Sequence, residues 1–496
     1  MINVNKKNKV KNKTFEFLTI FSMTFGIVVG SGIYLRNSGD SGVLARANDN
    51  PWVALSVWVF IGIFACMMMF SFIEASSAIK KDCFNTMPIL GDKFLGRNWG
   101  IVFSIFYVVI YSPLLTIIGA LFTINSLFNS IDVFIYSIQQ INLNDILGGD
   151  NARIAIELFL GCILLICFQV LNSLNRKSGN WIQIIVTILK FIPLIIVIVG
   201  GIVLFATGNV NENAFTNPGN FRFNSIFACL IPILFTFDGF LDSITIQKDI
   251  EHKSVVAPGM LVGVISTAIF YLIVTISIFL VSPTGNVLSM FSEASPSFSL
   301  AFNLIVTVTL LTTINAYTML FPKIIQASYN EKYLYKKNLD EKIVWKNACW
   351  ISIIITDVML ISFVVSSLLI DSSDYFLVTD YSADTGILFA FSSYALVMFG
   401  VVRNRKTNKV EVEKIKHTHI LNIITLSILI FMIGYMHYIS IIKNVINFFV
   451  GEGADNLIVP MMWVAFIVII INAFLINKKL IKKYNNHKKT INLKSK

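Results

Sequence analysis

Hydrophobic residues along this chain form long uncharged runs that are separated by short polar segments. A run of about 20 apolar residues is long enough to cross the hydrocarbon core of a bilayer as an α-helix. Twelve such runs are present, near residues 15–36, 52–79, 99–128, 154–172, 181–206, 225–246, 258–282, 298–322, 344–370, 386–402, 420–446 and 457–477. The pattern predicts an all-α integral membrane protein with twelve transmembrane helices.

Composition argues against a soluble protein of this size. Of the 496 residues, 55% are hydrophobic and 14% are charged, and the mean hydropathy is +0.74. Typical soluble domains carry about 25% charged residues. The six cysteines and five histidines show no metal-ligand spacing, so neither a metal nor another cofactor is expected.

The Lys and Arg residues indicate which ends of the predicted helices face the cytoplasm. With the N-terminus inside, 33 of the 39 lie in inner segments, five lie outside, and only Lys190 lies deep within a span. Because Lys and Arg favour cytoplasmic loops, both termini are expected in the cytoplasm of a plasma-membrane protein. The net charge of +11 would then contact anionic membrane lipid rather than nucleic acid.

The first span contains the most informative motif, in which Gly30, Ser31 and Gly32 interrupt an otherwise apolar run. Glycine costs roughly 1 kcal/mol relative to alanine inside a helix. Non-helical backbone at membrane depth is tolerated only inside protein or beside a cavity, and broken helices form the substrate site of many secondary transporters. A close helix–helix contact through small residues is the alternative explanation.

The sixth span carries a similar interruption. Pro232 lacks a backbone donor, Gly239 loosens the helix, and Asp238 and Asp242 are four positions apart on one helical face. The first and sixth spans stand five apart, and an odd offset reverses the direction of a helix in the membrane. The sequence therefore predicts two inverted five-span repeats, with helices one and six broken. The predicted organisation is a basic tail at 1–14, repeats at 15–206 and 225–403, peripheral spans at 418–478 and a basic tail at 479–496.

Five motifs in chain order resemble the amino acid–polyamine–organocation transporter superfamily. Gly30-Ser31-Gly32 is similar to the signature of its first helix, and the segment 235–239 is similar to the break in its sixth. The segments 72–80, 189–193 and 315–323 resemble its second, fifth and eighth helices. The Gly-Gly pair that usually follows the second helix is absent here. The resemblance implies a secondary carrier for small-molecule amino acids.

A broken helix offers unpaired N–H groups at the start of its second half and unpaired carbonyls at the end of its first. The N–H groups near Ser31, Gly32 and Ile33 are expected to bind the carboxylate of an amino acid. The carbonyls near Ile27 and Val28, with that of Phe235, are expected to face its ammonium group. Gly30 belongs to the same predicted site.

Phe235 is expected to act as an aromatic gate whose ring covers the bound substrate. The alternative is that it is packing filler, as one of 42 phenylalanines.

Lys190 demands a partner, because a charge at the membrane midplane costs several kcal/mol. The resemblance suggests that its ammonium replaces a cation held between helices one and eight in relatives that use sodium, close to Thr312 and Thr313. A role in coupling or change of state is expected, and a static tether between helices is the alternative.

Asp238, if it faces the site, would favour a substrate with a second positive charge, such as arginine, lysine or ornithine. A structural role, as a partner of Lys190 or a cap for broken backbone, is the alternative. The sequence therefore favours a cationic amino acid as the substrate, and a neutral amino acid or polyamine carrier of the same fold is the alternative.

The predicted function is alternating-access transport without covalent chemistry. Proton symport and exchange against a counter-substrate both stay open, as does the oligomeric state. A membrane-embedded enzyme would need clustered His, Asp or Glu at the membrane surface, and a channel would need a repeated pore motif or polar rings. The sequence shows neither.

Overall fold

The computed structural model of this protein describes residues 13–30, 32–37, 42–79, 86–174, 183, 189–208, 210, 212–239, 251–292, 294–336, 340–371, 374–415, 418–451 and 453–494. Within these residues the secondary structure is helical, without a β-strand. The prediction of an all-α protein is confirmed for this part of the chain.

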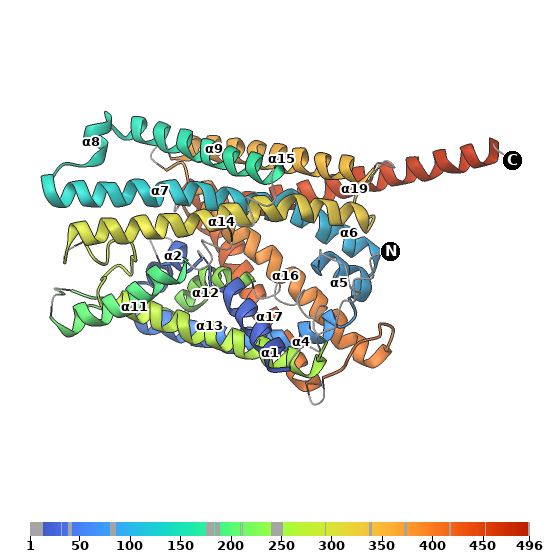
Figure 1. Ribbon diagram of the computed structural model, residues 1–496, viewed down its shortest axis with the longest axis horizontal. Coiled ribbons are helices and arrows are strands. Elements are labelled where there is room, and N and C mark those ends of the chain that lie inside the picture. The colour runs from blue at the N-terminus through green and yellow to red at the C-terminus, as the bar shows by residue number, and fades with distance from the viewer. Residues whose placement is uncertain are drawn as a thin grey trace, which may run out of the picture.

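Nine helices of the described residues are long and apolar enough to cross a membrane (Figure 1). Exposed apolar side chains such as Phe159 on α9 and Ile361 on α15 line their outer faces, as expected of helices that face lipid. The nine are α4 (Pro51–Ser76), Arg97–Gln139 (α6 Arg97–Phe106, η1 Tyr107–Tyr111 and α7 Ser112–Gln139), α9 (Asp150–Leu174), α13 (Val256–Phe279), α14 (Pro296–Asn330), α15 (Glu341–Ile370), α16 (Leu377–Thr407), His419–Val450 (α17 His419–His437, η4 Tyr438–Lys443 and α18 Asn444–Val450) and α19 (Ile458–Lys494).

Shorter helices cover the first, fifth and sixth predicted spans. They are α1 (Lys13–Val28) with α2 (Gly32–Arg36), α11 (Phe191–Ala206) and α12 (Phe223–Phe237). Parts of the fifth and sixth predicted spans, at 184–188 and 240–246, lie outside the described residues. The remaining helices lie between spans and are α3 (Val43–Arg46), α5 (Thr86–Leu95), α8 (Leu143–Leu147), η3 (Lys253–Val255) and η5 (Ala454–Leu457).

Several helices extend beyond the predicted apolar runs, and three of them illustrate the reasons. The third was expected to end at 128 but reaches Gln139, because its last turns carry polar side chains that face a cavity. The tenth begins at Leu377 rather than 386, since the acidic residues in its first turns are paired with arginines. The last continues to Lys494, through the expected basic tail, where lysine is a good helix former.

The long helices form two groups, which we name after their central members. The α7 group contains α7, α9, α14 and α15, and the α13 group contains α1, α4, α12 and α13. Figure 1 shows α7, α9, α14 and α15 side by side along one edge of the molecule, with α1, α4 and α13 together along the opposite edge. Helix α11 contacts members of both groups, and α16 packs against both α7 and α12.

Helix α1 approaches α13 closely because two glycines face it. An added Cβ would lie 3.0 Å from Ile20 at Gly259 and 2.7 Å from Thr24 at Gly263. Small residues spaced four apart allow membrane helices to pack at short distance. At the start of α1, the buried Glu16 carboxylate accepts the backbone N–H groups before α13, including that of His252 at 3.0 Å. These contacts join α1 and α13 along their length.

A buried ion pair joins α4 to α16. Glu74 has no exposed surface, and the Arg405 Nε donates to its two carboxylate oxygens at 2.9 and 3.1 Å. The Arg405 guanidinium also donates to Thr418 Oγ1 at 2.7 Å, before α17. One guanidinium therefore links three segments that are distant in sequence.

Arg405→Met should destabilise the protein by about 3–5 kcal/mol, because it leaves the buried Glu74 carboxylate without its partner. The measurement is the thermal melting temperature of the purified protein. The matched control is Lys414→Met, which removes an exposed contact to Asn408 and should change stability by less than about 0.5 kcal/mol. Equal melting temperatures for the two variants would contradict this account.

Candidate functional site

The interruption in the first predicted span lies directly against the end of α12. Helix α1 ends at Val28 and α2 begins at Gly32. A Cβ on Gly32 would lie 3.2 Å from Thr236 Cα and 3.5 Å from Phe235 Cδ1, so a side chain at this position would require α12 to shift. Ser31 lies outside the described residues.

A cavity of about 500 Å³ opens beside this contact. Its volume is in the range of small-molecule sites. Eight of the eleven predicted site residues line it, namely Val28, Gly30, Gly32, Lys190, Phe235, Asp238, Thr312 and Thr313. Ile27 belongs to α1, and Ile33 is buried in the core. We call this space the central cavity.

Lys190 reaches the broken helix from the start of α11. It is 9% exposed, and its ammonium donates to the backbone carbonyl of Gly26. Its own carbonyl lies 3.5 Å from the Tyr34 hydroxyl. The ammonium therefore satisfies one carbonyl at the end of α1.

Asp238 lies directly after α12 and is held by two phenol groups. Tyr111 from the third predicted span donates to one carboxylate oxygen, and Tyr394 from α16 donates to the other at 2.6 Å. Both oxygens of Asp238 thus have a donor from a different helix.

Two further polar side chains near the interruption, Tyr271 and Thr312, also have partners. The Tyr271 hydroxyl, from α13, donates to the Val28 carbonyl at 2.8 Å and accepts the Gly30 N–H at 3.3 Å. Thr312 donates to a carbonyl within its own helix.

A cluster of four charged side chains lies against the Phe235 ring and consists of Arg36, Arg46, Asp380 and Asp384. The Arg36 guanidinium stacks over the Phe235 ring at 4.6 Å from its centroid. Arg36 contacts Asp380 at 2.8 Å and Asp384 at 3.3 Å, while Arg46 contacts Asp384 at 2.5 Å. Because Arg36 is 1% exposed, this cluster fixes α2 against the start of α16.

A second cavity, of about 680 Å³, lies among the end of α7, the start of α9 and the segment between α15 and α16. We call it the outer cavity, after the predicted orientation. Leu35 and Phe122 line both cavities, so the two spaces are neighbours.

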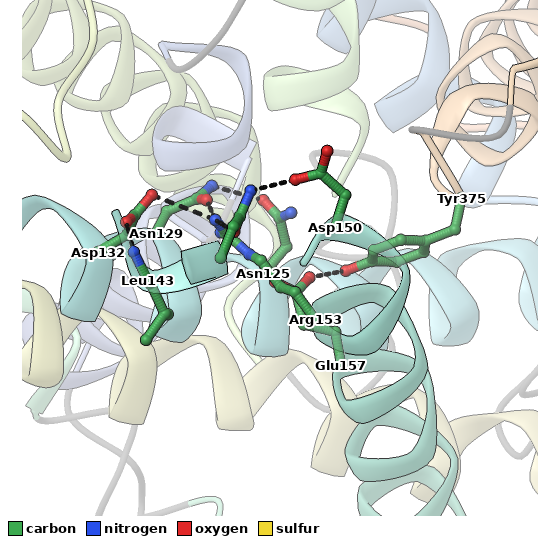
Figure 2. Close-up of polar contacts among 9 residues, drawn as sticks. Asn125, Asn129, Asp132, Leu143, Asp150, Arg153, Glu157 and Tyr375 are labelled. Atoms are coloured by element: carbon green, nitrogen blue, oxygen red, sulfur yellow. Dashed lines mark hydrogen bonds and ion pairs between the residues drawn. The ribbon is translucent and has the colours of Figure 1, made fainter. Parts of the chain in front are cut away.

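Arg153 is the centre of the polar wall of the outer cavity (Figure 2). It donates to Glu157 at 2.7 Å, Asp132 at 3.1 Å and Asn144 at 3.0 Å. It also donates to Asn129 at 2.5 Å. All three nitrogens of the guanidinium are occupied, which binds α7, α8 and α9 together.

Tyr375 connects this network to the segment before α16. Its hydroxyl donates to Glu157 Oε2 at 2.5 Å, as Figure 2 shows. Burial, with the nearby charge of Glu157, raises the pKa of the Tyr375 phenol well above its usual value, so the hydroxyl stays a donor. Five carboxylates and one guanidinium line the outer cavity: Asp132, Asp150, Glu157, Asp374, Asp380 and Arg153. Its wall is therefore predominantly acidic.

Sequence reasoning missed the tyrosines at the site. Tyr271, Tyr111 and Tyr394 stand singly in apolar runs, where nothing in the local pattern separates them from packing residues. The charged cluster did leave a signal, because Asp380 and Asp384 are four apart beside an apolar run. Only the fold brings them to Arg36.

The comparisons with known proteins agree on one class. The sequence model of the amino acid permease family matches residues 15–473. The chain is 24% identical over 264 residues to the serine/threonine exchanger SteT of Bacillus subtilis, a match covering 53% of each chain. It is 21% identical over 276 residues to the b(0,+)-type amino acid transporter 1 of Mus musculus, covering 55% of this chain and 52% of that one. The matched region thus spans about half the length of each of these two relatives.

The fold is also that of a solved transporter. A manganese transporter from Eremococcus coleocola superposes with a TM-score of 0.53 at 13% identity, covering 97% of this chain and 99% of that one. At that identity the likeness concerns the fold alone.

Proposed function

The chain belongs to the amino acid permease family, and from that membership we propose that it carries free amino acids across the plasma membrane by alternating access. The observation that carries this proposal is the central cavity. It brings a discontinuous helix together with Phe235, Asp238 and Lys190. Secondary transporters commonly bind their substrates beside such broken helices.

The proposed architecture is twelve spans in two inverted repeats, at 15–206 and 225–403, with broken helices one and six. Nine long apolar helices and two shorter ones support it, together with the interruption between Val28 and Gly32. The termini are proposed to be cytoplasmic on the basis of the Lys and Arg distribution.

The backbone of the substrate would bind at the two ends of the interruption. The N–H groups from Ser31 to Ile33 would take the carboxylate, since the Gly30 N–H already bonds to Tyr271. The Ile27 and Phe235 carbonyls would face the ammonium, and Phe235 would cover the substrate. The Val28 carbonyl keeps room for a second donor beside Tyr271.

The central cavity supports a neutral substrate side chain. Its wall beyond the backbone groups is mainly apolar, contributed by Leu35, Leu115, Ile118, Phe122, Leu310 and Leu320. Asp238 already accepts one phenol hydroxyl on each oxygen. A cationic side chain would have to compete with both tyrosines for this carboxylate.

A carrier for cationic amino acids is the second candidate. The acidic outer cavity favours it, because a cleft lined by one sign of charge raises the local concentration of the opposite charge. In that case Asp238 would bind the distal ammonium or guanidinium group.

Lys190 is proposed to act in coupling. Its ammonium donates to the Gly26 carbonyl and lines the same cavity as Thr312 and Thr313. Loss of its proton would release α1 from α11, which gives proton symport a physical route. Exchange against a second amino acid uses the same site without this step.

Proteoliposomes preloaded with unlabelled amino acid should accelerate uptake of the same labelled amino acid, because a carrier exchanges and a channel does not. A panel of leucine, serine and arginine tests the substrate class.

Gly32→Leu should abolish uptake while the protein still inserts, since its side chain would overlap Thr236 and Phe235. The matched control is Gly434→Leu, where an added Cβ meets nothing within 4 Å. Normal uptake by Gly32→Leu would refute the assigned site.

Asp238→Asn should lower leucine and arginine transport together, by about tenfold in Vmax/KM, because a hydrogen bond to a charged acceptor contributes about 1.5–3 kcal/mol. Asparagine keeps the size of the side chain and removes its charge. Competition assays with arginine and leucine provide the measurement. A selective loss of arginine competition, with leucine spared, would favour the cationic carrier instead.

Lys190→Met should abolish the stimulation of uptake by an inward pH gradient while leaving exchange measurable. The comparison is initial uptake rates with and without the gradient. Lys93→Met, which removes an exposed ammonium contact to the Ala78 carbonyl, is the control and should keep the stimulation. If uptake by Lys190→Met is still stimulated by the pH gradient, Lys190 acts only as a static tether between helices.

A further inference from the structure

Asp357 is a carboxylate in the middle of α15 that the proposed substrate site does not use. Its side chain is half-buried, on a helix whose outer face exposes Ile354, Val358 and Ile361. An ionised group inside a membrane span is costly, and such groups usually pair with another side chain and serve a function. The surroundings of Asp357 should therefore show what stabilises it and what it does.

The partner of Asp357 is Gln169 on α9, a helix that lies beside α15 in Figure 1. The Gln169 Nε2 donates to Asp357 Oδ1 at 3.3 Å, and this is the one hydrogen bond of Asp357 among the described residues. Gln169 is 5% exposed, and in the same part of the chain its amide oxygen Oε1 has no partner. A weakly supported carboxylate and an unpaired amide oxygen thus belong to one pair of side chains.

Protonation of Asp357 would satisfy both groups. A neutral carboxylic acid carries one O–H donor and keeps an acceptor oxygen, and a primary amide offers a donor and an acceptor side by side. The acid would accept from Gln169 Nε2 and donate its proton to Gln169 Oε1, which gives two hydrogen bonds. The ionised carboxylate has no donor for that oxygen, and it keeps a charge in apolar surroundings. The pair therefore favours the protonated acid.

Gln169 is also the first residue of a polar row that ends at the central cavity. Asn172 lies three positions farther along α9, on the same face. Its Nδ2 donates to Asn315 Oδ1 on α14 at 3.1 Å, and the Asn315 Nδ2 donates to Gln183 Oε1 at 2.9 Å. Gln183 lines the central cavity together with Lys190. The contact between α9 and α15 is thus connected to the proposed substrate site.

The helices packed against α15 carry other titratable groups. On α9, the Cys162 thiol interacts electrostatically with the Asp357 carboxylate. On α14, Tyr317 lines the central cavity, and Lys323 lies six positions farther along. On α15 itself, Lys346 is eleven positions away. The acidic groups of α7 and α16 are paired with arginines, and they are Asp132, Asp380 and Asp384.

We propose that Asp357 and Gln169 form a site that binds one proton within the membrane. A proton from water adds to a carboxylate oxygen of Asp357, which forms an O–H bond and removes the negative charge, and release returns the proton to water. No other reactant is consumed. This inference rests on the proposed function, in which the bound proton is a second ligand of the carrier, separate from the amino acid.

Infrared difference spectra between acidic and neutral pH test the site directly. The wild-type protein should show a C=O band of a protonated carboxylic acid at acidic pH, and Asp357→Asn should lose that component. Asparagine keeps the size of the side chain, and its amide can pair with both groups of Gln169, so this variant should fold. The control is Asp145→Asn, which removes an exposed carboxylate on α8 and should keep the component.

Gln169→Met provides a second variant, which keeps the length of the side chain and removes the amide. The Asp357 band should then move to higher frequency, because the acid loses its hydrogen-bond partner. Gln139→Met, at an exposed position at the end of α7, is the matched control and should leave the band in place. An unchanged band in Gln169→Met would overturn the paired site.

Transport assays with an amino acid that the wild type carries test the role of the proton. Asp357→Asn should lose the stimulation of uptake by an inward pH gradient and retain exchange. A functional carrier that does not respond to the gradient, or responds equally in Asp357→Asn, overturns the role of this proton in transport.

The outcomes separate this inference from the proposed function. A wild-type protein that carries no amino acid of the panel refutes the function, whereas the infrared spectra still decide whether Asp357 binds a proton. Spectra without a component that depends on Asp357, or with one that is equal at acidic and neutral pH, overturn the proton site in a protein that transports normally.

Discussion

The interruption in the first helix depends on one constraint: backbone polar groups that a broken helix leaves in apolar surroundings must find partners. The chain ends α1 at Val28 and starts α2 at Gly32. Side chains then supply the missing bonds, an ammonium at the Gly26 carbonyl and a phenol hydroxyl at Val28 and Gly30. In the proposed function, the N–H groups at the start of α2 bind the substrate carboxylate. In that proposal, the hydrogen bonds that stabilise the break also determine which backbone groups remain for the substrate.

The polar contacts fall into two kinds when they are set against the two helix groups. Tyr271 contacts α1 from α13, and Glu16 contacts the segment before α13, so a movement of one group against the other would not by itself separate these partners. The bonds from Tyr111 to Asp238 and from Lys190 to Gly26 join different elements across the cavity. In the proposed alternating-access cycle, movement of the third predicted span against the end of α12 would break the Tyr111–Asp238 bond, and movement of α11 against α1 would break the Lys190–Gly26 bond. A carrier that alternates between two states needs both kinds of contact, because a site that is fully rigid cannot open and one without fixed caps cannot bind.

Much of the architecture could be predicted from the sequence, because length and apolarity determine where a helix can cross a membrane. The interruption near Gly30-Ser31-Gly32 could also be predicted, since each glycine weakens a helix relative to alanine. The side chains that bond to that interruption could not be predicted from the sequence. Tyr271 lies 241 positions from Gly30, and no local period marks it. Asp238 was readable as a charged position, but its tyrosine donors come from two other helices. The local sequence pattern predicts where helices form and where they break. Which polar groups of different helices pair with one another depends on how the helices pack.

If the chain carries amino acids as proposed, the two cavities make different demands on the substrate, and these demands are compatible. A field from the acidic outer cavity changes the rate of encounter, whereas the fit in the central cavity decides which molecule stays bound. A neutral amino acid carries no net charge, so the outer carboxylates neither hold nor repel it strongly. An acidic amino acid is disfavoured at the outer wall by like charge, and it also finds an apolar wall inside. A cationic one is attracted outside and must then displace the tyrosines from Asp238. In the proposed carrier, the acidic wall would therefore disfavour anionic substrates, whichever of the two other classes the central cavity accepts.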